Sequence, residues 1–290
     1  MVKLYLIATV VVFALILYLT FAPRFHPEFV NRVAFYPGPE EAGAEQYLKI
    51  GAVQAERVMI PVSTRFGDRQ ISAAFFEKPG AKFVTLYSHG NAGSMLGRWP
   101  KVACLLDAGS SVLMYDYAGY GKSPGQASME AVAADGIAAY DYLAKIKHFK
   151  SDQIVLYGES IGGGVSSEIA RARDSCGLIL DCTFLSPAAW AKKRIGPLNI
   201  YPDALLMHPS LNVQSLFPSY KGAVLVIKPG HDDVIPTSHS DTLYAAATGT
   251  KQLLDLPTSP HGWVQQADMP LYAAGLKEFY RSLTPAAMNK

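Results

Sequence analysis

Hydrophobic residues form one long run near the amino terminus of this chain and many short runs after it. No residue from Leu4 to Ala22 is charged, and most are Leu, Val, Ile, Phe or Ala. A run of this length can cross roughly 30 Å of hydrocarbon as a helix. A cleaved signal peptide is the alternative, but its apolar part is usually shorter, and Pro23 disfavours cleavage there. We therefore predict a membrane anchor at residues 1–22.

Charged residues on either side of this run bear on its orientation. Lys3 precedes the run and Arg24 follows it, so the difference in flanking charge is small. We expect the amino terminus in the cytosol and the folded domain on the non-cytoplasmic side of the membrane. Residues 23–54 are rich in Pro, Gly and Glu, which predicts a spacer between the anchor and the domain.

From residue 55 onward, short apolar runs typical of buried strands alternate with segments of helical spacing. The first two runs, Arg57–Pro61 and Ile71–Phe76, predict an antiparallel hairpin. Later strands are expected at Phe83–Tyr87, Ser111–Asp116, Val155–Tyr157, Leu178–Leu180, Ala223–Ile227 and Gln252–Leu256. The alternation predicts an α/β domain at residues 55–290, with a mostly parallel central sheet and helices on both faces.

Polar, glycine-rich segments follow these strands, and the ends of parallel strands gather at one edge of a sheet, where ligands bind. One such segment, Gly158-Glu159-Ser160-Ile161-Gly162, connects an apolar strand to a helical segment. This G-x-S-x-G pattern is that of a nucleophile elbow, in which a strained turn projects the serine hydroxyl above the sheet. The pattern also arises by chance in a chain with 24 glycines. It therefore needs support from a base and an acid elsewhere in the chain.

A serine hydroxyl is a poor nucleophile unless a base, itself oriented by a carboxylate, lies within hydrogen-bond reach. Of the seven histidines, only His261 follows the last expected strand and completes the order Ser, Asp, His. The acid is expected after the preceding strand, where Asp232 and Asp233 are both candidates. Counting back from the helix start at Pro236 favours Asp232, whereas counting forward from Gly230 favours Asp233. We choose Asp232 as the predicted acid.

Overall charge and cysteine content narrow the classes of function. The formal net charge of +2 gives no case for a nucleic-acid partner. The three cysteines have no metal-ligand spacing, and three is not a disulfide framework. A triad of Ser160, His261 and Asp232 requires neither a metal nor an organic cofactor, and we expect none.

Several motifs together resemble those of α/β-hydrolase-fold serine hydrolases. They are Tyr87-Ser88-His89-Gly90-Asn91-Ala92-Gly93, Tyr115-Asp116-Tyr117-Ala118-Gly119-Tyr120-Gly121 and the Ser160 elbow. The similarity covers about residues 55–283, and it is closest to a membrane-anchored "alpha/beta-hydrolase domain" branch with an H-G-N-A-G loop. That branch includes lipase- and esterase-like enzymes, and protein depalmitoylases are among its relatives. The resemblance implies an oxyanion hole formed by the backbone N–H groups of Asn91 and Ile161.

Residues 184–222 interrupt the alternation at the place where this fold commonly carries a cap. Their apolar side chains either line an acyl pocket or pack the cap on its own domain. We expect hydrolysis of a carboxylic ester or thioester through an acyl-enzyme, with a small molecule, a lipid or an acylated protein as substrate. A peptidase or acyltransferase on the same triad is the alternative, and a non-catalytic, membrane-tethered binding module is another.

Overall fold

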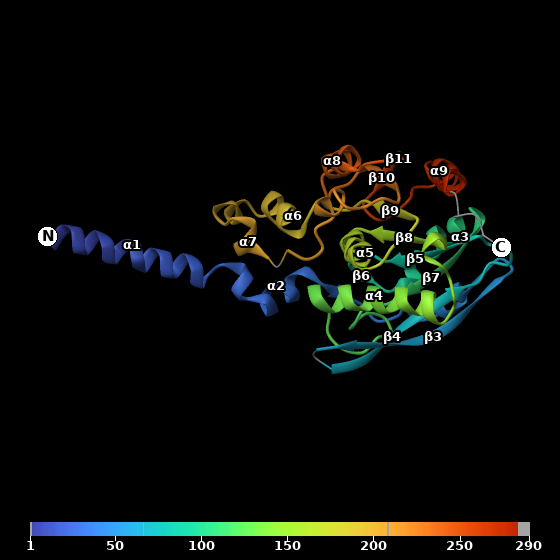
Figure 1. Ribbon diagram of the computed structural model, residues 1–290, viewed down its shortest axis with the longest axis horizontal. Coiled ribbons are helices and arrows are strands. Elements are labelled where there is room, and N and C mark those ends of the chain that lie inside the picture. The colour runs from blue at the N-terminus through green and yellow to red at the C-terminus, as the bar shows by residue number, and fades with distance from the viewer. Residues whose placement is uncertain (1, 66, 208, 284–290) are drawn as a thin grey trace.

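The computed structural model describes residues 2–65, 67–207 and 209–283. Figure 1 shows a central sheet between layers of helices, with a long helix projecting from the domain at the amino terminus. The order of the nine strands across the sheet is β11 (Lys251–Pro260), β10 (Ala223–His231), β9 (Gly177–Asp181), β8 (Ile154–Glu159), β5 (Phe83–Ser88), β7 (Ser110–Tyr115), β4 (Gly67–Phe76), β3 (Val53–Thr64) and β2 (Lys49–Ile50). The strands from β11 to β7 run parallel, and β4, β3 and β2 add antiparallel pairs at one edge. The predicted α/β architecture and its leading hairpin are therefore confirmed.

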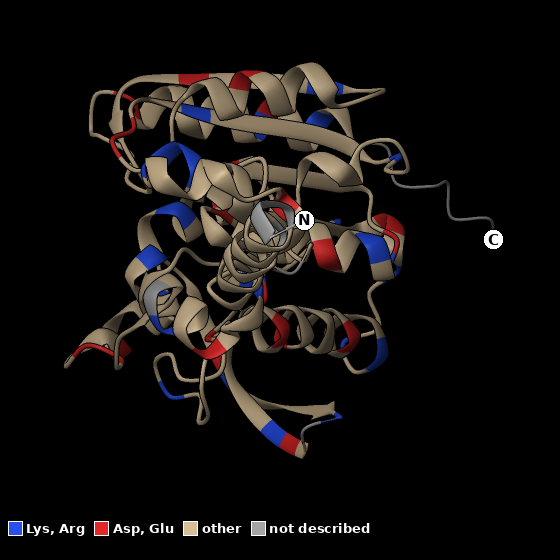
Figure 2. Ribbon diagram, turned by 90° about the vertical axis from the view of Figure 1, so that its left-hand side faces the viewer, with Lys and Arg blue, Asp and Glu red and all other residues tan. Residues whose placement is uncertain are grey.

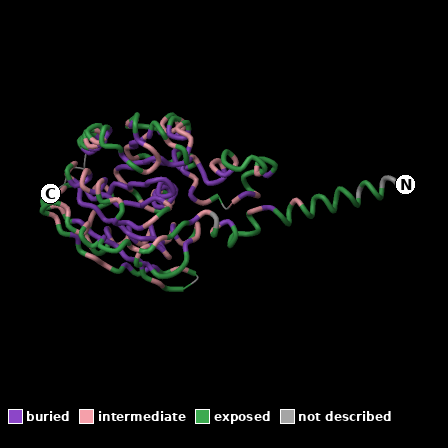
Figure 3. The backbone as a smooth tube through the Cα atoms, turned by 180° about the vertical axis from the view of Figure 1, so that it is seen from behind, coloured by how far each residue is buried: buried purple, intermediate pink, exposed green. Residues whose placement is uncertain are grey.

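Side chains along each strand alternate between the two faces of the sheet, so that every strand contributes to two cores. In β5, Leu86 belongs to one core and Tyr87 to the other. The first face is covered by α4 (Met129–Lys145), α5 (Ile161–Ala172) and α8 (Ser238–Ala246), and the second by α3 (Trp99–Asp107) and α9 (Met269–Ser282). Figure 3 shows the buried residues concentrated where these layers meet.

The amino-terminal helix α1 (Val2–Thr20) leaves the domain and is exposed along most of its length (Figures 1 and 3). Its 19 residues span about 28 Å at 1.5 Å per residue, which is short of the roughly 30 Å of a bilayer core. The last turn of the helix also contacts the folded domain. The Tyr18 ring stacks on Tyr201 with 4.7 Å between ring centroids, and the Tyr18 hydroxyl donates to the Ile200 carbonyl at 2.7 Å.

Within the described residues, no helix has both the length and the apolar character that a bilayer crossing demands. The predicted single-pass anchor at residues 1–22 is therefore wrong, and so is the non-cytoplasmic placement of the domain that depended on it. The uncharged run suggested a sufficient length by residue count, but the helix ends at Thr20. The last turn of the helix packs against the domain through Tyr18.

Residues 23–54 fold onto the domain rather than crossing its surface as a plain spacer. They form η1 (Pro23–Phe25), α2 (Pro27–Ala34), β1 (Tyr36–Pro37) and η2 (Ala44–Leu48) before β2. Phe35 is buried in the core on the α4 face of the sheet. Strand β1 pairs in parallel with the short β6 (Ala92–Gly93), which lies in the loop after β5. This segment therefore lies directly against the H-G-N-A-G loop.

The insert at residues 184–222 contains α6 (Pro187–Arg194), η5 (Gly196–Ile200), α7 (Asp203–Leu206) and η6 (Gln214–Leu216). Tyr201 and Leu206 are buried against Ala22 and Ala188, so this part of the insert packs on the amino-terminal segment. Leu216, in contrast, belongs to the main core. Viewed along α1 in Figure 2, basic and acidic residues are interspersed around the domain.

Candidate active site

Ser160 lies at the sharp turn between β8 and α5. Its backbone has φ 55° and ψ −117°, a region that a residue with a side chain rarely adopts and that marks a strained turn. The flanking glycines are required by close packing: a Cβ at Gly158 would lie 2.4 Å from the Gly162 carbonyl oxygen, and one at Gly162 would lie 2.0 Å from the Ser88 carbonyl oxygen. The strand, turn and helix expected around the elbow are therefore present.

Two predicted residues from distant loops meet Ser160 at this turn. His261 Nε2 lies 2.9 Å from Ser160 Oγ, and His261 Nδ1 lies 2.7 Å from Asp232 Oδ2. A carboxylate oxygen only accepts hydrogen bonds, so Nδ1 carries the proton and Nε2 is free to accept the serine hydroxyl. The neighbouring Asp233 is exposed, and it is Asp232 that partners the histidine. The structure thus brings Asp232, Ser160 and His261 into one row.

Hydrogen bonds between side chains and backbone groups hold both ends of this row. The Asp232 side chain is 1% exposed, and its Oδ1 accepts the N–H groups of Val234 and Ile235 at 2.9 and 2.7 Å. This cap leaves Oδ2 directed at the histidine. At the other end, the Thr183 hydroxyl donates to the Ser160 carbonyl oxygen at 2.6 Å. The Asp232 side chain and the Ser160 backbone are therefore held in place by the protein itself.

The loop after β5, His89 to Gly93, lies beside the elbow and contains the predicted donor Asn91. Ile161, the other predicted donor, is the first residue of α5, and the first N–H groups of a helix have no acceptor within it. The Asn91 amide donates to the Ala34 carbonyl at 2.6 Å and accepts from the Tyr120 hydroxyl at 2.7 Å. The side chain of Asn91 is thus occupied by structural contacts.

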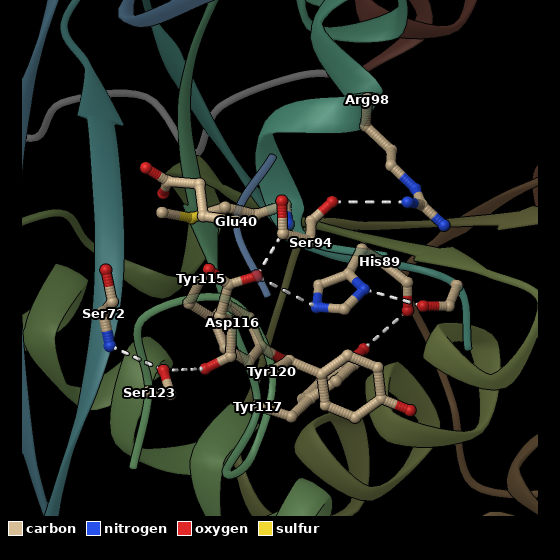
Figure 4. Close-up of polar contacts among 12 residues, drawn as sticks. Glu40, Ser72, His89, Ser94, Arg98, Tyr115, Asp116, Tyr117, Tyr120 and Ser123 are labelled. Carbon is tan, nitrogen blue, oxygen red and sulfur yellow. Dashed lines mark hydrogen bonds and ion pairs between the residues drawn. The ribbon is translucent and has the colours of Figure 1, made fainter. Parts of the chain in front are cut away.

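His89 and Asp116 are buried together under this loop (Figure 4). His89 Nδ1 lies 2.7 Å from the Gly90 carbonyl oxygen, and Nε2 lies 3.6 Å from Asp116 Oδ1. Burial raises the pKa of Asp116 to about 7. Burial, together with the positive charge of Arg98, lowers the pKa of His89 to about 3.

A second group of buried charges adjoins the nucleophile on the α3 side. Lys101 Nζ donates to Glu159 Oε2 at 2.8 Å and to Asp181 Oδ2 at 2.6 Å. Glu159, the residue before Ser160, also accepts from Arg98 Nε at 3.1 Å and from the Tyr87 hydroxyl at 2.8 Å. Burial opposes ionisation of Glu159, but the charges of Lys101 and Arg98 outweigh it and hold its pKa below the ordinary value. We call Lys101, Arg98, Glu159 and Asp181 the four-charge cluster.

Sequence reasoning missed the supports of the site, namely the four-charge cluster and the contacts of His89, Asp116 and Tyr120. The tyrosines of the segment after β7 offered a weak signal, because Tyr117 and Tyr120 stood in a glycine-rich loop. The lysine offered none. His208, one of the seven histidines, lies outside the described residues.

Cys182 lies close to the acid and the base. Among the described residues, its Sγ and ligand atoms of Asp232 and His261 form the group that could hold a metal ion, all within 4.8 Å of one another. Asp232 Oδ2 and His261 Nδ1 already partner each other. Burial raises the pKa of the Cys182 thiol well above its ordinary value. A metal there would have to break the row that joins the acid to the base.

The insert contacts the loop that carries Asp232. Trp190 Nε1 donates to the Val234 carbonyl at 3.0 Å, and Arg194 Nη1 donates to the Asp233 carbonyl at 3.3 Å. A separate cavity of about 660 Å³ lies between the β3–β4 hairpin and the start of α4, where Arg69 and Ser128 are among its lining residues. Ser160, Asp232 and His261 do not line that cavity.

Comparisons with known proteins agree with this architecture. A family model described as "Serine aminopeptidase, S33" matches residues 81–211. The uncharacterized protein YfhR of Escherichia coli K12 is 31% identical over 261 residues, which cover 85% of this chain and 86% of YfhR. The alpha/beta hydrolase domain-containing protein aho-3 of Caenorhabditis elegans is 31% identical over 202 residues, which cover 69% of this chain and 57% of that protein.

Solved structures show the same fold at lower identity. The esterase Pf2001 of Pyrococcus furiosus superposes with a TM-score of 0.68 at 17% identity, over 86% of this chain and 98% of the esterase. Likeness at this level of identity concerns the fold alone. The match to YfhR is evidence of a family relationship, because it spans most of both chains at 31% identity. This chain therefore belongs to the same family as YfhR, and it has the α/β-hydrolase fold.

Proposed function

We propose that this α/β hydrolase cleaves carboxylic esters or thioesters through an acyl-enzyme on Ser160. The observation that carries the proposal is the row from Ser160 Oγ through His261 to Asp232, with distances of 2.9 and 2.7 Å. A serine nucleophile needs a base within hydrogen-bond reach and an acid that orients the base. The strained Ser160 backbone, which directs the hydroxyl away from the sheet, supports the same role.

In the proposed reaction, Ser160 Oγ bonds to the acyl carbon while its proton moves to His261 Nε2. Asp232 stabilises the resulting imidazolium and keeps Nδ1 protonated. The carbonyl oxygen gains the electron pair and accepts hydrogen bonds from the N–H groups of Asn91 and Ile161. Collapse breaks the bond to the leaving group, which takes the proton from His261. Water then repeats these steps on the acyl-enzyme, releasing the acid and restoring Ser160.

The proposed substrate is an acyl ester of a small molecule or lipid, or an acylated protein. Support for an ester comes from the fold shared with an esterase. We propose that residues 184–222 act as a cap, since Trp190 and Arg194 contact the loop that carries Asp232. A peptidase is the second candidate, because the matching family model is described as a serine aminopeptidase.

Labelling with a fluorophosphonate probe tests the nucleophile. We expect stoichiometric labelling at Ser160 and loss of both labelling and activity in Ser160→Ala. Ser166→Ala is the matched control, because Ser166 is a buried serine of the helix that follows Ser160, and its hydroxyl has no hydrogen-bond partner among the described residues. Activity on p-nitrophenyl esters of increasing chain length, compared with aminoacyl p-nitroanilides, separates esterase from peptidase. Labelling that persists unchanged in Ser160→Ala would refute the proposal.

The two adjacent aspartates give a second test. Asp232→Asn removes the acceptor that orients His261, so kcat should fall by roughly 10²–10⁴-fold. Asp233→Asn is an isosteric change at the next, exposed position, and kcat should stay within about twofold of the wild type. Both variants are compared at equal folded concentration, established by thermal unfolding. The reverse ranking would show that Asp233 supplies the acid.

A further inference from the structure

The groups around His89 and Asp116 (Figure 4) determine how many protons these two side chains hold. Both side chains are fully buried. The Gly90 carbonyl oxygen only accepts hydrogen bonds, so His89 Nδ1, at 2.7 Å from it, must carry a proton. Neutral His89 then presents a bare lone pair at Nε2. That atom faces Asp116 across 3.6 Å.

Without a further proton, two acceptors would face each other in the protein interior. Neither His89 Nε2 nor Asp116 Oδ2 has a hydrogen-bond partner among the described residues, although Asp116 Oδ1 accepts the Met95 N–H at 2.6 Å. Buried groups without a partner are costly. One proton between His89 Nε2 and Asp116 Oδ1 would turn this contact between two acceptors into a hydrogen bond after a shift of a few tenths of an ångström. It can lie on either side, as a carboxylic acid donating to Nε2 or as an imidazolium donating to a carboxylate.

We propose that His89 and Asp116 share one proton, and that this proton fixes the Gly90–Asn91 peptide with its N–H directed at the reacting carbonyl. The inference rests on the proposed function, since it gives the oxyanion donor Asn91 its support. His89 and Asp116 are positioning residues in this scheme and do not touch the substrate.

The loop geometry shows how a buried proton controls an exposed donor. Three successive carbonyl oxygens are held: His89 O by the Tyr117 hydroxyl at 2.8 Å, Gly90 O by His89 Nδ1 at 2.7 Å, and Asn91 O by the Tyr120 hydroxyl at 3.0 Å. The C=O and N–H groups of a trans peptide point in opposite directions. Holding Gly90 O against the His89 ring therefore turns the Asn91 N–H away from the ring.

Loss of the shared proton removes this restraint. The ionised Asp116 then draws the remaining imidazole proton to Nε2, and the bare Nδ1 faces Gly90 O, so the Gly90–Asn91 peptide is repelled. Burial, with a smaller contribution from Glu40, raises the pKa of Asp116 to about 7, although the backbone N–H groups of Met95 and Lys122 and the charge of Arg57 oppose the rise. For His89, burial and Arg98 lower the pKa, while Glu159 raises it. The proton is therefore lost as the pH rises above neutrality.

Asp116→Asn tests the proposal, because an asparagine side chain cannot ionise and its amide oxygen can still accept the Met95 N–H. Wild-type kcat should fall as the pH rises above about 7, whereas kcat of the variant should stay level, with KM little changed in both. The matched control is Asp135→Asn: Asp135 is also a buried carboxyl and accepts the Ala118 N–H at 2.9 Å, but it does not contact His89. That control should keep the wild-type alkaline decline.

A second pair of variants keeps the test independent of Asp116. His89→Ala removes the donor to Gly90 O, and kcat should fall about 10²-fold, as for loss of one oxyanion donor. His89→Asn places an amide donor near the position of Nδ1 and should recover part of the loss. Thermal unfolding establishes that both variants are folded, and fluorophosphonate labelling shows whether Ser160 still reacts.

The outcomes separate this inference from the function on which it rests. If Ser160→Ala abolishes activity but Asp116→Asn keeps the wild-type alkaline decline, the shared proton is refuted and the hydrolase proposal stands. Equal kcat for His89→Ala and His89→Asn, with both folded, would also refute it. If Ser160→Ala retains full activity, the proposed function itself fails.

Discussion

Two groups of buried charges lie next to the row of Ser160, His261 and Asp232. They differ in how completely each buried charge is balanced by opposite charges and hydrogen bonds. The four-charge cluster balances two cations against two anions, and Tyr87 and Tyr157 donate to the carboxylates as well. The pair of His89 and Asp116 has two facing atoms at 3.6 Å and no such surplus of donors. A compensated cluster resists titration, while an under-compensated pair changes its proton content near neutral pH.

The difference corresponds to what each group supports. The four-charge cluster joins α3 to the ends of β8 and β9, because Lys101 binds Glu159 and Asp181 at once. These strand ends carry Ser160, whose N–H donates to the Asp181 carbonyl at 2.9 Å. The proposed nucleophile thus rests on the cluster in which cations and anions are balanced. The proposed oxyanion loop rests on the pair of His89 and Asp116.

Lys101→Met gives the largest effect expected from this comparison. It leaves Glu159 and Asp181 buried with one cation fewer, and breaking a buried pair in this way costs about 3–5 kcal/mol. We expect the free energy of unfolding to fall by that amount, measured by urea denaturation. Lys145→Met is the control, because Lys145 forms an exposed pair with Asp141 and should cost well under 1 kcal/mol. A loss no larger than that of the control would contradict the distinction between the two groups.

The free energy of unfolding should depend on pH in opposite directions for the two groups. The pKa of Asp116 rises from 3.8 in the unfolded chain to about 7 in the folded protein. Between these values only the folded state binds the proton, so stability falls by about 1.4 kcal/mol per pH unit as the pH rises. The pKa of Glu159 is lowered instead, so its contribution is present above the ordinary value of 4.5 and is lost as the pH falls below it.

Asp116→Asn should abolish the first of these slopes. The free energy of unfolding of both proteins is to be measured from about pH 5 to about pH 7. Relative to the wild type, the variant should become more stable by about 1.4 kcal/mol for each unit by which the pH rises. Above about pH 7 the difference should be constant, because both states of the wild type are then ionised at this position. A difference that stays constant over the whole range would show that Asp116 is ionised in the folded protein throughout.

The sequence predicted those parts of the site that follow from local pattern and chain order. Strand and helix periodicity placed Ser160 and His261 after strands, and parallel strands bring such residues to one edge of a sheet. The choice between Asp232 and Asp233 rested on counting. The structure adds the physical reason that counting lacked: the Asp232 carboxylate caps two backbone N–H groups while its other oxygen faces His261.

The supports of the site could not be inferred in the same way, because they depend on contacts between distant segments. Lys101 and Asp181 are 80 residues apart, and a lysine in an amphipathic helix usually lies in solvent. Nor does apolar content tell where a helix ends. The run from Leu4 to Ala22 suggested an anchor, yet its last turn packs against Tyr201 of a segment that had no clear periodicity.

Arg98 connects the two groups and gives the last and smallest prediction. Its Nε donates to Glu159 Oε1 at 3.1 Å, and its Nη1 donates to the Ser94 carbonyl at 3.3 Å, next to Met95 on the Asp116 side. Its charge also lowers the pKa of His89. Arg98→Met leaves Lys101 on Glu159, so the loss of stability should be about 1–2 kcal/mol, below that of Lys101→Met.

The same variant should move the alkaline decline of kcat. Without the nearby positive charge, His89 holds the shared proton more strongly, so the decline should shift upward by a fraction of a pH unit. Arg98→Lys keeps the charge and should leave the decline near its wild-type position, which separates the effect of charge from that of the guanidinium hydrogen bonds. The measurement is the pH profile of kcat for both variants. No shift in Arg98→Met would show that the two groups titrate independently, and an equal shift in both variants would assign the effect to the guanidinium hydrogen bonds instead of the charge.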